Sequence, residues 1–171
     1  MPNLIDGKLT GEIYINDDSI KKLSLAEIST RAGIVFQNPE TQLFLPTIED
    51  EVAFGAENLC LEQTELVERI ETALQITGLT HLRMNSPFQL SGGQKQLVVL
   101  AAVLAMNPAI LLLDEVFAQI DRTGRKNILP TITELAAQGK TILMIDHNCE
   151  NLKICTRILH LENGVLEENA V

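Results

Sequence analysis

Apolar residues along this chain form two kinds of pattern. Continuous apolar runs at residues 32–36, 109–113 and 141–145 have the length of strands and predict buried ones. Residues 62–78 instead repeat apolar positions at three- and four-residue spacing, which predicts a helix that Gly78 closes. Strands and helices therefore both contribute to the expected core.

Capping and turn residues place the other expected elements. Ser91 can cap a long helix running to Met106. Residues 122–138 are typical of a helix, although Pro130 should kink it or mark its first turn. The remaining expectations are a strand over 11–15, helices over 25–30, 48–59 and 149–155, and a hairpin over 157–168 around Asn163-Gly164.

This order of elements predicts one α/β domain. Helices that alternate with continuously apolar strands indicate a largely parallel sheet. The nearly all-helical block at 48–106 interrupts the alternation, so we expect a helical subdomain inserted into a core made by residues 1–47 and 107–171.

Composition narrows the possible functions. The chain has 171 residues and a net charge of −10, which argues against a nucleic-acid-binding surface. Its longest apolar stretch, residues 97–106, is about half of what a membrane span needs. Three scattered cysteines without a CxxC indicate a reducing compartment, with thiols expected to be mostly buried.

Two carboxylates, Asp114 and Glu115, follow an aliphatic run directly. In open α/β folds ligands bind at the carboxyl ends of parallel strands. A carboxylate there can hold Mg²⁺ or its bound waters, and the next can orient an attacking water for phosphoryl transfer. Taken alone, the pair is more often the solvated start of a loop, because short motifs match by chance.

The segment LSGGQ at 90–94 adds a second feature. Ser91 can cap the following helix, while Gly92 and Gly93 allow backbone N–H groups to approach an anion at the positive helix end. An ordinary capped helix after a glycine-rich turn is the alternative. His147 and Gln37 each follow a predicted strand, and each alone could be purely structural.

Taken together and in this order, these features resemble the ATPase subunits of ABC transporters. VFQNPETQLF is similar to the Q-loop, LSGGQKQ to the signature, ILLLDE to the Walker B strand, AQID at 118–121 to the D-loop and DH at 146–147 to the switch histidine. Residues 36–59 resemble the energy-coupling-factor and cobalt-type importer branch. The resemblance covers essentially the whole chain and implies a P-loop NTPase-like fold.

The resemblance also implies roles in ATP hydrolysis. Asp114 would help to hold Mg²⁺, Glu115 would be the general base, and His147 would contact the γ-phosphate. Gln37 would touch water or Mg²⁺ and couple the site to a transmembrane partner.

Other residues would act on a facing ATPase subunit. Asp121 would bridge the two subunits of a head-to-tail dimer. The residues expected to contact ATP bound on that subunit are Ser91, Gly92, Gly93 and Gln94. The implied place in the cell is the cytoplasmic face of a membrane, as a peripheral subunit.

One part of the family pattern is missing. No GxxxxGK[ST] occurs in the sequence, although backbone N–H groups and the Lys of that loop cradle phosphates. Gly7-Lys8 is followed by Leu9, and Gly139-Lys140-Thr141 lacks the earlier glycine and joins a helix to a strand. The expectation is an N-terminally truncated ABC ATPase domain whose sheet is incomplete and whose isolated chain binds ATP weakly.

Two departures are smaller. Leu97 stands where family members usually have Arg, and Val116 stands where they usually have Pro. Loss of that Arg puts contacts of the signature helix in doubt.

Two other functions stay open at this point. A non-catalytic remnant or interaction module could use the signature helix and the Q-loop region to dock partners. An ATPase of the DNA-repair or translation type is a further alternative, which the negative charge and the 36–59 stretch disfavour.

Overall fold

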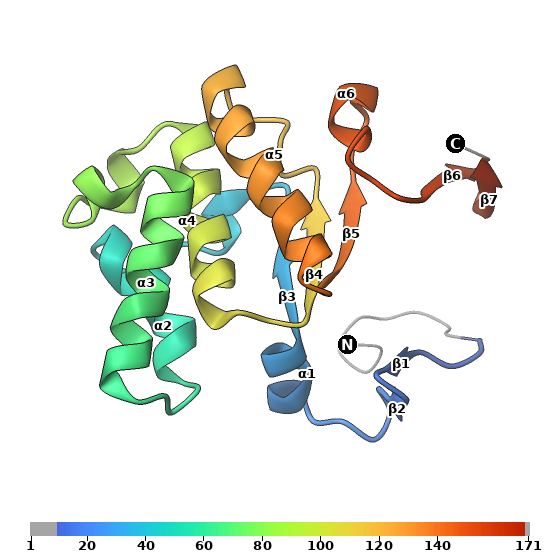
Figure 1. Ribbon diagram of the computed structural model, residues 1–171, viewed down its shortest axis with the longest axis horizontal. Helices are drawn as coiled ribbons and strands as arrows, with labels where there is room; N and C mark the ends of the chain where they lie inside the picture. Colours follow the sequence, from blue (N-terminus) through green and yellow to red (C-terminus); the bar gives the residue numbers. More distant parts are fainter. Residues whose placement is uncertain (1–9, 170–171) are drawn as a thin grey trace.

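A parallel three-stranded sheet forms the centre of the fold in the computed structural model, which describes residues 10–169. Its strands are β3 (Ala32–Val35), β4 (Ile110–Asp114) and β5 (Thr141–Ile145), in the order β3-β4-β5 (Figure 1). Val35 pairs with Leu113, and Leu113 pairs with Met144. The three predicted apolar runs are thus neighbouring strands, and their carboxyl ends lie at one edge.

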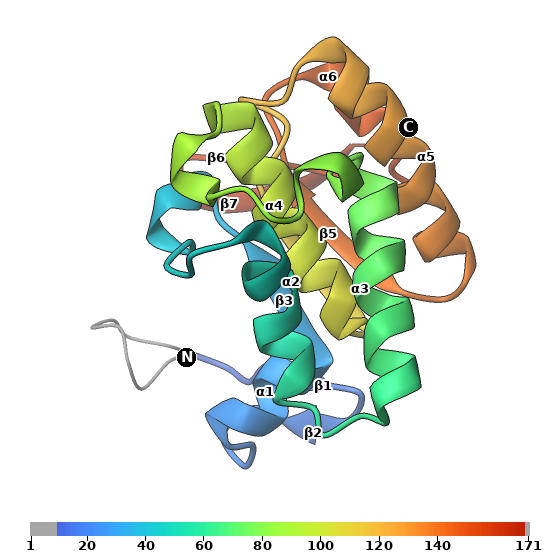
Figure 2. The same ribbon diagram turned by 90° about the vertical axis from the view of Figure 1, so that its left-hand side faces the viewer.

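Three helices make up the region that lies beside the sheet. They are α2 (Ile48–Glu57), α3 (Gln63–Thr77) and α4 (Gly92–Met106). Figure 2 shows α2 and α3 side by side, with α4 between them and the sheet. Thr47 caps α2 by accepting the N–H of Asp50, and Gly78 ends α3 with a φ of 71°.

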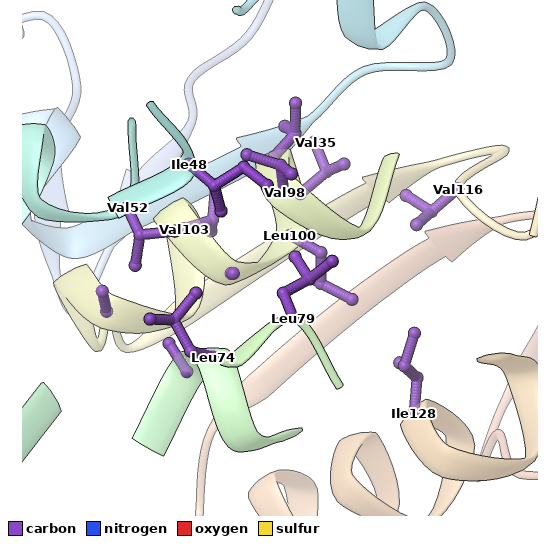
Figure 3. Close-up of a cluster of buried hydrophobic side chains, with 14 of the residues drawn as sticks. Val35, Ile48, Val52, Leu74, Leu79, Val98, Leu100, Val103, Val116 and Ile128 are labelled. Atoms are coloured by element: carbon purple, nitrogen blue, oxygen red, sulfur yellow. The ribbon is translucent and has the colours of Figure 1, made fainter. Parts of the chain in front are cut away.

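The core lies where α4 meets the sheet. Val35, Leu111 and Leu113 are at most 2% exposed and face the helices. Val98, Leu100 and other apolar residues of the helices close around them (Figure 3). The opposite face of the sheet is more open, because alternate strand residues point the other way.

The remaining elements flank this core. α1 (Leu25–Arg31) precedes β3, and α5 (Arg122–Ala137) links β4 to β5. Short 3₁₀ turns occur at Pro39–Thr41, Thr80–Leu82 and Pro87–Gln89 (η1, η2 and η3). The chain then forms α6 (Cys149–Leu152) and a hairpin of β6 (Ile158–Glu162) and β7 (Val165–Asn169), which lies away from the helices in Figure 1.

The hairpin turn has the predicted position. Asn163 and Gly164 both have positive φ, 51° and 80°, as a tight two-residue hairpin turn requires. No helix in the described part of the chain is long and apolar enough to cross a membrane.

Several predicted boundaries are wrong. The expected strand over 11–15 is only β1 (Tyr14–Ile15), because the chain turns back at Asn16-Asp17 to pair with β2 (Asp18–Ser19). The short helix expected over 149–155 ends at Leu152. The first nine residues, which include Gly7-Lys8, lie outside the described residues.

Two side-chain expectations also need correction. Pro130 lies in the interior of α5 and not in its first turn. Cys60 and Cys149 are exposed rather than buried. Cys155 is partly buried, and this burial raises the pKa of its thiol.

Candidate nucleotide-hydrolysis site

Glu115 lies directly after β4, at the carboxyl edge of the sheet. Its N–H donates to the carbonyl of Ile145 at 2.9 Å, which ties the end of β4 to the end of β5. Its φ is 48°, a conformation that is uncommon for a residue with a side chain. The backbone therefore leaves the strand sharply here, and the carboxylate remains partly accessible, at 23% of its surface.

Two polar side chains from the segments that follow the neighbouring strands meet this carboxylate. Gln37 Nε2 donates to Glu115 Oε2 at 2.6 Å. His147 Nε2 lies 2.9 Å from Glu115 Oε1, and its ring is largely exposed. One residue after each of three parallel strands thus contributes to a single polar cluster, as expected where the strand ends converge.

A local network holds the turn that carries His147. The Asp146 carboxylate accepts the N–H of Asn148 at 2.7 Å and the side-chain amide of Asn151 at 2.8 Å. Asn151 is only 4% exposed. The sequence interpretation missed Asn151 as a supporting residue, since only its burial and its contact reveal this role.

The signature turn is built separately from that cluster. Ser91 and Gln94 form a capping box: the Ser91 hydroxyl accepts the N–H of Gln94, and Gln94 Oε1 accepts the N–H of Ser91. Gly92 and Gly93 are the first two residues of α4. The turn therefore places the positive end of a helix of fifteen residues behind two glycines.

Gln119 packs against this turn, and the sequence interpretation did not single it out. A Cβ built on Gly92 would lie 2.6 Å from Gln119 Oε1, and one on Gly93 would lie 2.5 Å from the Gln119 carbonyl oxygen. The Gln119 side chain could move away from Gly92, but its backbone could not move easily away from Gly93, so only glycine admits the approach at Gly93. The 118–121 segment and the signature turn are thus in direct contact.

Asp121 caps α5 in this structure. Its carboxylate accepts the N–H of Gly124 at 2.7 Å, and the residue is exposed. The implied bridge to a second subunit stays a prediction.

Asp114 and Gln37 are the residues that could hold Mg²⁺. Asp114 is the last residue of β4 and is partly exposed. Gln37 uses its amide nitrogen on Glu115, which leaves its amide oxygen as a hard ligand. The described residues contain no cluster of three or more His, Cys, Asp or Glu suited to a metal. One carboxylate and one amide oxygen nevertheless fit Mg²⁺, because this ion commonly keeps waters and takes the rest of its ligands from phosphates.

A small apolar groove lies beside the chain segment that follows Gln37. It has a volume of about 130 Å³ and is lined by residues that include Gln42, Phe44, Phe54 and Met106. The rings of Phe44 and Phe54 meet edge to face at 5.1 Å and are 59% and 46% exposed. The buried Glu51 carboxylate holds the loop in place by accepting the N–H groups of Phe44 and Leu45.

Comparisons with a family model and with known proteins agree on one family. Residues 3–118 match the family model described as ABC transporter. The energy-coupling factor transporter ATP-binding protein EcfA2 of Clostridioides difficile is 42% identical over 164 residues, covering 92% of this chain and 57% of that protein. EcfA1 of Streptococcus thermophilus is 38% identical, covering 96% and 61%.

Solved structures confirm the predicted fold class. The ATP-binding cassette MJ0796, solved as a dimer bound to ADP and phosphate, superposes with a TM-score of 0.84 at 26% identity, covering 96% of this chain and 75% of that one. CbiO1 of Clostridium perfringens, part of the cbiONQ transporter complex, gives 0.77 at 33% identity, covering 92% and 64%. The chain spans from 26% to 61% of the length of the curated relatives it matches.

Proposed function

Because this chain belongs to the ABC transporter family of ATP-binding domains, we propose that it is an energy-coupling ATPase unit of a membrane importer. One observation carries the proposal: Glu115 accepts a hydrogen bond from Gln37 and lies 2.9 Å from the Nε2 of His147. These side chains come from positions far apart in the sequence and meet at the sheet edge where α/β folds bind ligands.

The chemistry proposed is hydrolysis of the terminal phosphate of ATP. The Glu115 carboxylate takes a proton from a water whose oxygen forms a new bond to the γ-phosphorus. The bond between that phosphorus and the bridging oxygen breaks, and ADP and phosphate leave. Gln37 and His147 hold Glu115 and the water in position.

Magnesium would be held by Asp114 and the Gln37 amide oxygen. When it is bound, the ion supplies positive charge that balances the phosphate oxygens. The Gln37 amide nitrogen donates to Glu115, while its amide oxygen would be a ligand of the ion, so a substitution of Gln37 would affect both contacts.

The signature turn serves a second ATPase subunit in this proposal. Gly92 and Gly93 present N–H groups at the positive end of α4, which suits the phosphates of ATP held on a facing subunit. The head-to-tail arrangement also places Asp121 at the subunit boundary. MJ0796, a structural relative, has been solved as a dimer, which supports this arrangement.

The apolar groove is the proposed contact with the transmembrane subunit. Phe44 and Phe54 are exposed aromatic residues beside the loop that carries Gln37. A partner seated there would act on the site through that loop. The proposal places the chain on the cytoplasmic face of the membrane, and the similarity to EcfA and cbiO1 transporter proteins supports its link to a transporter.

The proposed reaction also needs a phosphate-binding loop. The sequence contains no GxxxxGK[ST], so we expect the chain alone to bind Mg-ATP weakly and not to hydrolyse it. Calorimetric titration with Mg-ATP measures this directly. Binding in the micromolar range would contradict the expectation.

A complementation assay tests the signature turn. The chain is added to an EcfA-type subunit that has its own phosphate loop but an inactivated signature serine. We expect ATP hydrolysis to appear with the wild-type chain and not with Ser91→Arg. A folded chain that restores no hydrolysis would favour the non-catalytic interaction module.

A longer chain tests Glu115. The phosphate-loop segment of the C. difficile relative is joined ahead of Met1, and hydrolysis is compared with and without Glu115→Gln. We expect a loss of about 10²–10⁴-fold, the usual contribution of a general base. Equal rates in the two proteins would remove Glu115 from the mechanism.

A further inference from the structure

The side chain of Gln96 is a buried amide that touches the loop carrying Gln37. Gln96 lies in the second turn of α4 and is 0% exposed. Its Nε2 donates to the carbonyl oxygen of Phe36 at 2.9 Å. Its Oε1 is buried without a hydrogen-bond partner among the described residues. An unpaired buried acceptor lowers the stability of the fold. Any benefit of burying this amide must therefore come from its hydrogen bond to Phe36.

Gln42 holds the other side of the same residue. Its Oε1 accepts the N–H of Phe36 at 2.8 Å, and its Nε2 donates to the carbonyl of Ile34 at 3.2 Å. Phe36 follows the last residue of β3, so no strand of the sheet pairs with it among the described residues. The side-chain amides of Gln42 and Gln96 thus bind the peptide groups of Phe36 as a neighbouring strand would. They fix the backbone for one residue beyond the end of β3.

The next residue in the chain is Gln37. The Phe36 ring is 41% exposed and does not anchor the backbone in the core. The direction in which Gln37 leaves the sheet is therefore set by the two peptide groups of Phe36. Gln37 then reaches Glu115 Oε2 at 2.6 Å, a distance that leaves little tolerance for a shift of the loop.

A salt bridge supports this arrangement from the exposed side. Lys95, the neighbour of Gln96, lies 2.6 Å from Glu40 of the same loop, and Lys95 is itself only 14% exposed. This contact with Lys95 holds the pKa of the Glu40 carboxyl below its usual value. Two consecutive residues of α4 thus contact the chain before and after Gln37.

We propose that Gln42 and Gln96 are positioning residues, which fix Phe36 so that Gln37 meets Glu115. The geometric part of this inference concerns the chain as it stands. Its consequence for catalysis rests on the proposed function. Gln42 also lines the apolar groove. A partner bound in that groove would therefore affect the contact with Glu115 through Phe36 and Gln37.

Side-chain amide resonances of ¹⁵N-labelled protein test the geometric part. Gln37→Met identifies the Gln37 signal by its loss. In the wild type we expect one Gln37 amide proton shifted downfield by its short bond to the carboxylate. Gln96→Met and Gln42→Met should each move this signal toward the position of a solvent-exposed glutamine. Gln138→Met, at an exposed amide at the end of α5, should leave it unchanged.

Urea unfolding separates positioning from loss of fold. Gln96→Met removes the unpaired acceptor as well as the donor, so we expect its unfolding midpoint to stay close to that of the wild type while the Gln37 signal moves. If one variant does not fold, the other still decides. A Gln37 signal that stays in place in a folded Gln96→Met or Gln42→Met protein would overturn the inference.

The extended chain with a phosphate loop gives the catalytic readout. We expect Gln96→Met to lower kcat by about tenfold or more, as misplacement of a reacting group does, with KM for ATP little changed. An unchanged kcat would show that the position of Gln96 matters for the structure but not for catalysis. An extended wild-type chain without any hydrolysis would count against the proposed function, while the amide spectra would still decide the positioning.

Discussion

At the scale of single residues, Gly93 makes the closest contact of the signature turn. A Cβ at this position would lie 2.5 Å from the carbonyl oxygen of Gln119, which is backbone and cannot rotate away. Gly93→Ala must therefore separate α4 from the 118–121 segment. We expect the free energy of unfolding to fall by about 1–3 kcal/mol, the usual cost of overpacking, as measured by urea denaturation.

Gly55 offers a matched control for that substitution. It also lies in a helix, and a Cβ there would meet the Sδ of Met106 at 2.6 Å. A thioether is flexible and can move aside, while alanine favours the helix by about 1 kcal/mol over glycine. We expect Gly55→Ala to be close to neutral. Equal losses for both variants would show that the Gln119 contact is not the cause.

Prediction from sequence succeeds for some residues of the site and not for others. Gln37, Glu115 and His147 could be expected to converge, because each follows a parallel strand. The contact of Gln119 with the signature turn could not be expected, since it depends on how two loops pack. The positive φ of Glu115 and the hydrogen bond of its N–H to Ile145 likewise leave no mark in the sequence.

At the scale of elements, Arg83 joins α2 to α3. Its guanidinium contacts Glu49 through Nε and Nη2 at 2.9 and 2.7 Å, and Glu71 through Nη1 at 2.6 Å. The hydrogen bonds to Arg83 lower the pKa of Glu49 from its ordinary value of 4.5. The charged carboxylate is therefore favoured in the folded chain more than in the unfolded chain.

This clamp predicts a dependence of stability on pH. Since the folded pKa of Glu49 is the lower one, its contribution is complete above about pH 4.5 and is lost as the pH falls through the folded value. We expect the urea midpoint of the wild type to fall below pH 4.5, and that of Arg83→Met to start lower and fall less. Arg122→Met, at the exposed start of α5, should keep the wild-type slope. If the urea midpoints of all three proteins changed with pH in parallel, the contact of Arg83 with Glu49 would not be the cause of the pH dependence.

Elements with their own end signals were the easiest to predict. α4 begins after the Ser91 capping box and ends at Met106, where Asn107 caps it with a positive φ, so local chemistry defines both ends. The β1–β2 hairpin was missed because Asn16-Asp17 is a weaker turn signal than Asn-Gly. The pairing of β6 with β7 was predicted because Asn163-Gly164, the turn between them, is the stronger Asn-Gly signal.

At the scale of the whole molecule, the two faces of the sheet differ. Leu111 and Leu113 face the helices and are 1% and 2% exposed, whereas Leu143 and Ile145 are 54% and 53% exposed. The apolar run at 141–145 predicted burial on both faces, but Ile142 and Met144 on the helix side are only partly buried, and the residues on the other side are exposed. Periodicity reveals that a strand is apolar, but only the assembled fold shows which face is covered.

This open face predicts that the chain associates with itself. Leu143 and Ile145 present apolar surface, and within the described residues β5 pairs only with β4, which leaves backbone groups unpaired along its outer edge. The net charge of −10 opposes association but acts over the whole surface and is screened by salt. Light scattering should therefore show particles that grow with protein and salt concentration, together with binding of a hydrophobic dye.

Threonine substitutions separate this surface effect from stability. Leu143→Thr with Ile145→Thr gives both positions a polar, β-branched side chain that suits a strand, so we expect the fold to persist while association and dye binding fall. Ile142 lies on the opposite face of the sheet and packs against the core, so Ile142→Thr should instead lower the unfolding midpoint without reducing association. A wild-type chain that stays monomeric at high salt would contradict this prediction, because its exposed sheet face would then be stable in water without a partner.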